Sequence, residues 1–485
     1  MARNIGVNLT SSTQSGPTNI SAPAGILHIA GATQAGPTGR AEHIRSFANY
    51  QDVYGARTAY SADMFDTARV FFQEGGADLL VSRVVGPAAT PAAVELTTAS
   101  EDLTPLVRVE AAFAGGFANG YQVQVEGTDG AYTVRILDTT GEVVASWSRI
   151  TSVAQLVERA GYTGAWTIQS LTEEPENFNL ATGTFDLAGG ADDRENITVA
   201  SIMEALDDAG TSGEGGAVAV PGYPADVIGG ELATYAQEHR KIALLAGERD
   251  ATVGEIETLS AELQATLPGE YAGLFYPWVR IPDGNSTRLI SPEGYVAAVR
   301  ARAFQGGEFW TTPAGLPARA RYVTGTATPI TSDVLDRLDD AFVNGIESAG
   351  GPVFLNNWSS LSADRENWGL LKSRDIINNL KRLFQSVLQQ YIWRTIDGNG
   401  ILLGQIESEI EGVLAPIADA GGLYAEQDSA GELLHPGYRV NVDATNNTTT
   451  TLSRNELYAD VAVKLSPVAK LINVEITKVP LAASL

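Results

Sequence analysis

Both ends of the chain have the pattern of isolated β-strands on polar tethers. Apolar residues alternate with polar or small ones in each, which is the period of a half-buried strand. In the first strand the apolar residues are Ile5, Val7 and Leu9. In the second they are Ile472, Val474 and Ile476. Neither strand has an obvious partner nearby in the sequence. The pattern therefore predicts two extended strand arms, over residues 1–22 and 467–485.

Between the arms, residues 23–94 have the pattern of a β-α-β unit. The run GILHIAG is typical of a buried strand, and DLLVSRVVG is typical of a second one. The stretch between them places apolar residues at helical spacing, with Ser61 as a plausible N-cap and two glycines at the end. Strands joined by a helix usually pair in parallel. Residues 23–94 are therefore predicted to form the first part of an α/β core.

At 485 residues the chain is long enough for two to four domains. Short alternating strands and turns predict a β-rich outer insertion. A middle α/β domain follows, and then a C-terminal part of the core with two amphipathic helices, over residues 373–394 and 400–415. The predicted boundaries are 95–195 for the insertion, 196–340 for the middle domain and 341–466 for the C-terminal part. The fold class is thus multidomain α+β or α/β, with an inserted β-rich domain and two terminal arms.

Composition excludes several classes of function. The chain has no cysteine, which excludes disulfides, cysteine-based metal sites and thiol catalysis. A net charge of −26 argues against nucleic-acid binding, because phosphates would be repelled. No apolar run is long enough to span a membrane, and the N-terminus lacks the apolar stretch of a secretory signal. We therefore expect no direct membrane insertion, and a protein that remains in the cytoplasm of the cell that makes it.

Sequence motifs for catalysis, metals and cofactors are missing. There is no phosphate-binding loop, no GxGxxG after a strand and no GxSxG. The histidines are scattered, and His28 lies in an apolar run where we expect a core residue. One acidic turn could hold a cation, although we favour a solvated domain boundary. Its carboxylates are those of Asp192, Asp193 and Glu195. The sequence thus predicts no catalytic residue, no metal ligand and no cofactor.

The run GLFYPWVRI, residues 273–281, is the most aromatic apolar stretch of the chain. We expect it to form one core strand in which the proline marks an edge or an end. The alternative is an aromatic platform over Phe275–Trp278 for a sugar or nucleotide, which would indicate a small-ligand-binding α/β enzyme. The core strand is the favoured interpretation.

The order of these segments resembles contractile tail sheath proteins of bacteriophages and related injection systems. The stretch LFYPWVRIPDGNSTRLISPEGYVAAVRARAF is similar to a family motif with an aromatic-Tyr-Pro-Trp strand, a Pro-x-Gly loop and a helix of small residues. Its core positions here are Tyr276, Pro277, Trp278, Pro292 and Gly294. Other segments match in the same order, among them FDTARVFFQEGGADLLVSRVVG and FDLAGGADD. The loop departs from the family pattern, since SPEG stands where two prolines and a serine are usual.

The resemblance implies a structural subunit and not an enzyme. Such subunits polymerise as stacked hexameric rings around an inner tube, and contract to drive the tube through the target cell envelope. The implied partners are further copies of the chain, the inner tail tube protein, and baseplate and tail terminator proteins. The implied location is the virion tail after assembly in the host cytoplasm. The terminal strands would add to the sheets of neighbouring subunits. A phage, a bacteriocin and another injection system all remain open.

Overall fold

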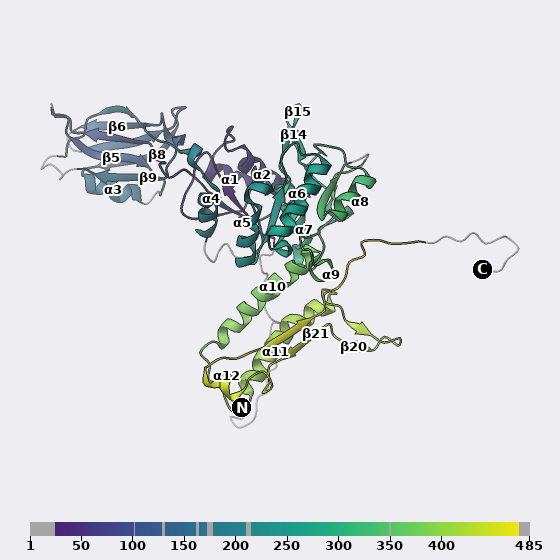
Figure 1. Ribbon diagram of the computed structural model, residues 1–485. Coiled ribbons are helices and arrows are strands. Elements are labelled where there is room, and N and C mark those ends of the chain that lie inside the picture. The colour runs from purple at the N-terminus through teal and green to yellow at the C-terminus, as the bar shows by residue number, and fades with distance from the viewer. Residues whose placement is uncertain are drawn as a thin grey trace, which may run out of the picture. The chain divides into compact units, whose positions relative to one another are not determined.

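The computed structural model describes residues 25–100, 102–128, 131–161, 164–171, 178–209, 215–348 and 351–474 (Figure 1). Ile5, Val7, Leu9 and Ile476 of the expected arms lie outside these ranges. The chain divides into two compact units, Gly25–Asn378 and a second one that contains Asn379 onward. Each unit is described by itself below.

An eight-stranded sheet is the centre of the first unit. Its order is β18-β17-β13-β12-β11-β1-β3-β2. The six inner strands are parallel, and the edge strands β2 and β18 are antiparallel to their neighbours. The strands are β1 (Leu27–Gly31), β2 (Glu42–Ile44), β3 (Leu79–Arg83), β11 (Ala217–Ala219), β12 (Ile242–Ala246), β13 (Ala272–Tyr276), β17 (Val343–Glu347) and β18 (Phe354–Leu355). The predicted parallel β-α-β unit is confirmed by the pairing of β1 with β3.

Helices cover both faces of this sheet because its inner strands are apolar on both sides. Leu27 and Ile29 of β1 pack into one apolar cluster, and Ala30 belongs to the other. The first cluster includes residues of α1 (Phe47–Tyr54), α2 (Ala62–Gln73) and α7 (Glu293–Ala303). The second includes residues of α4 (Val199–Asp207), α5 (Ala225–Glu238), α6 (Val253–Thr266) and α8 (Ser332–Asp340). The unit therefore has three layers, with the sheet in the middle.

The segment between β3 and α4 forms two antiparallel sheets of its own. One has the order β4-β5-β9 and the other β10-β6-β7-β8. Their strands are β4 (Ala93–Thr97), β5 (Pro105–Ala111), β6 (Gln122–Thr128), β7 (Ala131–Leu137), β8 (Val143–Ile150), β9 (Trp166–Ser170) and β10 (Gly183–Asp186). Together with α3 (Val153–Gly161) they surround a separate apolar cluster. All of these elements except the first two residues of β4 fall within 95–195, the range of the expected β-rich insertion.

The run GLFYPWVRI does not form one strand, so this part of the prediction was wrong. It contributes β13 to the large sheet and then β14 (Val279–Asp283) to a small sheet with β15 (Ser286–Ile290) and β16 (Gly325–Thr326). Pro277 stands between β13 and β14, and the Tyr276–Pro277 peptide is cis. Proline has no N–H to donate, so it ends a ladder of main-chain hydrogen bonds.

The expected boundary between residues 340 and 341 lies within one sheet. β17 and β18 follow this boundary, yet they pair with β13 of the middle segment and with each other. The sheet also includes β1, β2 and β3 from the first segment. Residues 23–94 and 196–340 are therefore parts of one α/β layer structure rather than separate domains.

The second unit consists of helices and two hairpins. A long helix, α10 (Leu371–Leu388), passes from the first unit into the second, after the short α9 (Arg365–Trp368). The remaining elements are α11 (Ile401–Asp419), β19 (Glu426–Gln427), β20 (Leu433–His435), β21 (Tyr438–Asn441), α12 (Thr449–Ser453) and β22 (Asp460–Val463). The apolar face expected for α11 is confirmed, because Leu402, Ile406, Ile410 and Leu414 are all buried. No helix in the described ranges is both long and apolar enough to cross a membrane.

Candidate assembly site

The aromatic residues around the motif core pack and form hydrogen bonds within the first unit. Tyr276 is buried, and its hydroxyl donates to the carbonyl oxygen of Ala251 at 3.0 Å. The indole Nε1 of half-buried Trp278 donates to the carbonyl oxygen of Gly247 at 3.0 Å. Both bonds fasten the loop that joins β12 to α6. Phe275 is fully buried and lies 5.6 Å from the ring of Trp358. This geometry fits the core interpretation and leaves no open aromatic platform.

Pro292 and Gly294 set the close packing of two helices. Pro292 directly precedes α7, a position where its fixed φ is compatible with a helix start. A Cβ on Gly294 would lie 2.8 Å from the main-chain oxygen of Thr67 in α2. Only a residue without a side chain allows α7 to lie this close to α2. All the motif residues except the half-buried Trp278 thus lie within the packed core, where they shape the scaffold.

Glu293 carries the carboxylate between these two residues. It is buried at the first position of α7, and burial raises its pKa to about 7. Asp63 of α2 also has a raised pKa, first because of burial and then because of Asp66. This end of the α2–α7 pair therefore contains carboxyl groups that resist ionisation.

A buried glutamate at the other end of α2 was not predicted. The side chain of Glu74 accepts main-chain N–H bonds from Arg321, Tyr322 and Val323 at 2.7 to 3.0 Å. It also accepts from Nη1 of Arg302 at 3.2 Å. These partners are more than 200 residues away in the sequence, so no local pattern points to them. Glu74 ties the loop after α7 to the C-terminal end of α2.

Two buried arginine–aspartate pairs join further parts of the protein. Nη2 of Arg300 lies 2.6 Å from Oδ1 of Asp375 in α10, and Trp358 donates to the same carboxylate at 3.1 Å. Nη2 of Arg83 lies 2.9 Å from Oδ1 of Asp192, which links the large sheet to the end of the inserted segment. Removing one partner of such a pair is costly because it leaves an uncompensated buried charge.

The candidate cation turn is thus occupied by structural contacts. Asp192 pairs with Arg83, and Asp193 accepts from the main-chain N–H of Ala88 at 2.9 Å. Within the described ranges, no three histidine, aspartate or glutamate residues are arranged to hold a metal ion. His28 is a buried core residue, as expected, with Nε2 2.9 Å from Oγ of Ser82. Burial holds its pKa well below the usual value, so the ring is neutral.

The features suited to assembly lie on the surface. Ile472 and Val474 are 76% and 75% exposed and belong to no strand of the same chain. Trp393, in the connection between α10 and α11, is 99% exposed and follows the exposed Ile392. Ile472 and Val474 belong to the second unit, and the motif core belongs to the first.

Comparisons with known proteins support these observations at the level of the fold. No family model matches the sequence, and no curated protein matches it. Solved structures do match. The sheath tail protein of Listeria innocua has a TM-score of 0.63 at 12% identity, over 91% of this chain and 95% of that one. The sheath tail protein of Desulfitobacterium hafniense has a TM-score of 0.59 at 13% identity, over 90% and 93%.

An assembled sheath has a similar fold as well. The helical sheath of the anti-feeding prophage in its contracted state has a TM-score of 0.55 at 15% identity. That match covers 99% of this chain and 100% of the other. Both free sheath proteins and assembled sheaths therefore share the architecture along most or all of their length. The chain has the fold of contractile tail sheath proteins.

Proposed function

We propose that the chain is the structural subunit of a contractile tail sheath. Copies would polymerise as stacked hexameric rings around an inner tube, and contraction would drive the tube through the target cell envelope. The observation that carries the proposal is the match to sheath proteins over 90% or more of both chains. The other partners would be the inner tail tube protein, the baseplate and the tail terminator. The location would be the tail of the particle, after assembly in the host cytoplasm.

The terminal arms would connect neighbouring copies. Ile472 and Val474 are exposed and lie in no strand of the part of the chain that the structure describes, which fits a strand donated to a neighbour. A strand added to a neighbour's sheet edge binds through main-chain hydrogen bonds, and alternate side chains fill pockets. Ile476 and the N-terminal set of Ile5, Val7 and Leu9 would act in the same way. Such connections would keep the copies linked while the folded part of each copy, between its two arms, moves.

The connection between α10 and α11 is our proposed contact with the inner tube. Trp393 and Ile392 together expose a large apolar surface at this point. Tryptophan is among the residues that most often dominate binding energy in interfaces. The exposed tryptophan is the reason why we place the tube contact in this connection.

The alternative, a small-ligand-binding enzyme with an aromatic platform, has no support in the geometry. Phe275 and Tyr276 are buried, and the polar atoms of Tyr276 and Trp278 are bonded to main-chain carbonyls. A ligand would need the faces of these rings to be open. We therefore do not assign an enzymatic activity.

Negative-stain electron microscopy of the purified full-length protein, alone and with the inner tube protein, tests the proposal. We expect hollow, helically striated tubes of uniform width. The control is a variant lacking residues 1–12, which should remain folded and soluble but form no tubes. Uniform small particles under both conditions would contradict the sheath function. Normal tubes from the truncated variant would contradict only the role of the N-terminal arm.

A further inference from the structure

One face of the first unit is strongly acidic. Helices α4, α5 and α6 lie on the same side of the large sheet, and none of the three contains lysine or arginine. Together they carry eight carboxylates. These are Glu204, Asp207, Asp226, Glu231, Glu238, Glu255, Glu257 and Glu262. A surface of this kind repels other acidic proteins and attracts a basic one.

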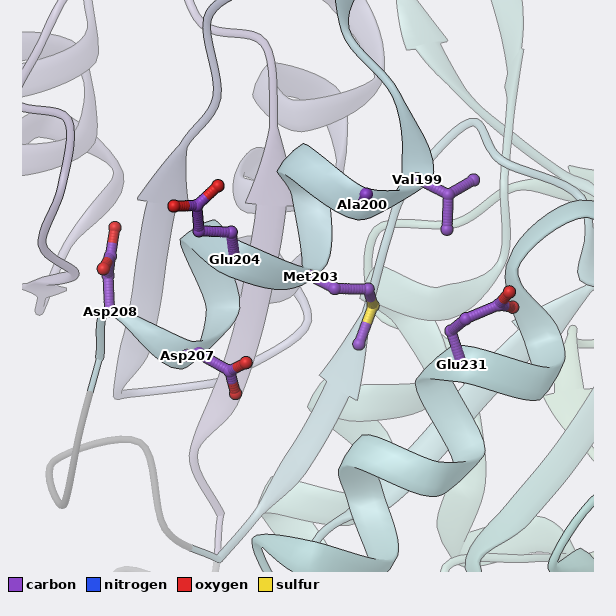
Figure 2. A pocket seen from close by; sticks show the side chains of 7 residues that line it. All are labelled: Val199, Ala200, Met203, Glu204, Asp207, Asp208 and Glu231. Carbon is purple, nitrogen blue, oxygen red and sulfur yellow. The ribbon is translucent and has the colours of Figure 1, made fainter.

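A groove of about 610 Å³ runs along this face between α4 and α5. Figure 2 shows Met203 on α4 and Glu231 on the neighbouring α5 among the residues that line it. The apolar lining comes from Val199, Ala200 and Met203, and the acidic lining from Glu204, Asp207, Asp208 and Glu231. All four acidic residues are exposed. The groove thus combines an apolar contact with a surrounding set of exposed carboxylates, of which Asp207 lies 3.3 Å from Nε2 of His239.

The opposite face of the same unit carries a cluster of arginines. Arg69 of α2 stacks over the ring of Tyr322, with its guanidinium carbon 5.6 Å from the ring centroid. Arg302 donates to the main-chain oxygen of Arg319 at 2.8 Å. Arg319 and Arg321 are exposed. We call Arg69, Arg302, Arg319 and Arg321 the arginine patch.

Two members of the arginine patch, Arg319 and Arg321, are exposed, whereas the side chain of Arg302 is only 7% exposed and its Nη1 lies 3.2 Å from Glu74. Glu74 is the buried carboxylate partner of Arg302, and three of the bonds that Glu74 accepts come from main-chain N–H groups rather than from guanidinium groups. Arg319 and Arg321 therefore present guanidinium groups that can pair with carboxylates from another molecule.

We infer that the α4–α5 groove binds the arginine patch of a second copy of this chain. The two surfaces lie on opposite sides of one sheet, so they cannot meet within one copy. Guanidinium groups pair with carboxylates through two parallel hydrogen bonds, and arginine is the residue best suited to such contacts. Head-to-tail contacts between different surfaces of identical copies build rings or helical polymers. The inference rests on the proposed sheath function and specifies which surfaces carry it.

Zero-length cross-linking tests the contact directly. A carbodiimide joins carboxylates to primary amines and does not react with arginine, so the test uses the variant Arg319→Lys/Arg321→Lys, which retains both charges. The probe is a second copy of the same full-length variant. We expect mass spectrometry to identify links from positions 319 and 321 to Glu204, Asp207 or Glu231. The matched control is Arg45→Lys/Arg149→Lys, two exposed arginines outside the patch. It should give no links to the groove.

Charge reversal gives a second, functional readout. Reversal of the groove alone, with Glu204→Lys/Asp207→Lys/Glu231→Lys, should lower the assembled fraction by about tenfold or more. Adding Arg319→Glu/Arg321→Glu to the same chain restores opposite charges and should restore assembly. A control with Glu95→Lys/Glu142→Lys/Glu158→Lys, at exposed acids of the inserted segment, should assemble normally.

The outcomes separate the inference from the proposed function. Tubes or oligomers without groove-to-patch links, or full assembly of the groove variant, would overturn the inference and leave the sheath function in place. Absence of any self-association by the unmodified protein, with or without a tube protein, would contradict the function and the inference together.

Discussion

At the scale of single residues, buried charges connect segments that are distant in the sequence. Glu74 is the clearest case, because one carboxylate accepts bonds from Arg302 and from three successive main-chain N–H groups. We predict that Glu74→Gln lowers the free energy of unfolding by about 3 kcal/mol, since it leaves Arg302 without its charge partner. Urea unfolding measures the change. The control Glu308→Gln alters an exposed glutamate and should be neutral within about 0.5 kcal/mol. Equal effects would contradict the role of Glu74.

Gly294 illustrates a residue whose importance lies in its lack of a side chain. We predict that Gly294→Ala destabilises the protein by about 1–3 kcal/mol, because the new methyl group would press on the main chain of Thr67. Gly230→Ala is the matched control, since it lies within α5 and a methyl group there meets no atom within 4 Å. It should stabilise by about 0.5–1 kcal/mol through helix propensity. Thermal unfolding compares them, and a stable Gly294→Ala variant would show that the two helices are not closely packed.

Glu293 makes stability depend on pH. Its pKa is about 7 in the folded protein and near 4.5 in the unfolded chain. Between these values the folded state holds the proton and the unfolded state does not, so the free energy of unfolding should fall as pH rises from about 4.5 past 7. Glu293→Gln keeps the group neutral at every pH and should remove this component. The measurement is the difference in unfolding free energy between wild type and variant at pH 5 and pH 8. A difference that does not change with pH would refute the assignment.

At the scale of elements, we predict that the side chains on one side of the C-terminal arm are needed for assembly and those on the other side are not. We expect Ile472→Asp/Val474→Asp to abolish assembly without changing monomer stability, because both side chains are exposed in the single chain. Leu471→Asp is a matched control, since Leu471 is 78% exposed but belongs to the other side of the alternating pattern. It should assemble nearly normally. Electron microscopy and urea unfolding separate the two effects. Equal loss of assembly in both variants would argue against a strand that docks by alternate residues.

Local patterns predicted most elements, and long-range pairing explains most of what they missed. The β-α-β unit followed from two apolar runs on either side of a stretch with helical spacing, and α11 followed from the helical spacing of apolar residues that are buried. The break at Pro277 was missed, since a proline at the end of a strand and one between two strands look alike in a sequence. The links of Glu74 and of Arg83 join residues more than 100 positions apart. No periodicity in one chain encodes such pairs.

Local patterns also predicted the part of the candidate site that lies in one continuous segment, and missed the part that folding assembles from two helices. The terminal alternation marked Ile472 and Val474, whose exposure in the single chain is consistent with an arm. The motif core is a sequence signature, and in the structure all of its residues except the half-buried Trp278 are buried within the first unit. The acidic groove was not predicted, because its residues come from two helices that become neighbours only after folding.

At the scale of the whole molecule, we propose that different parts of the subunit link neighbouring copies and set how their first units meet. The arms would join copies permanently, while the charged faces of the first unit would set how the bodies meet. Because the chain has a net charge of −26, an acidic face is the partner that the arginine patch favours in an assembly of identical copies. Because salt screens exposed charges, contacts between bodies should weaken with ionic strength more than the arms do.

The most direct test of the central claim is a cryo-electron microscopy reconstruction of tubes formed by the full-length protein. We expect a hollow helical tube in which residues 5–9 and 472–476 of each copy are strands paired with the sheets of neighbouring copies. A tube in which both terminal segments remain unpaired, or a protein that forms only discrete small particles with and without the inner tube protein, would contradict it.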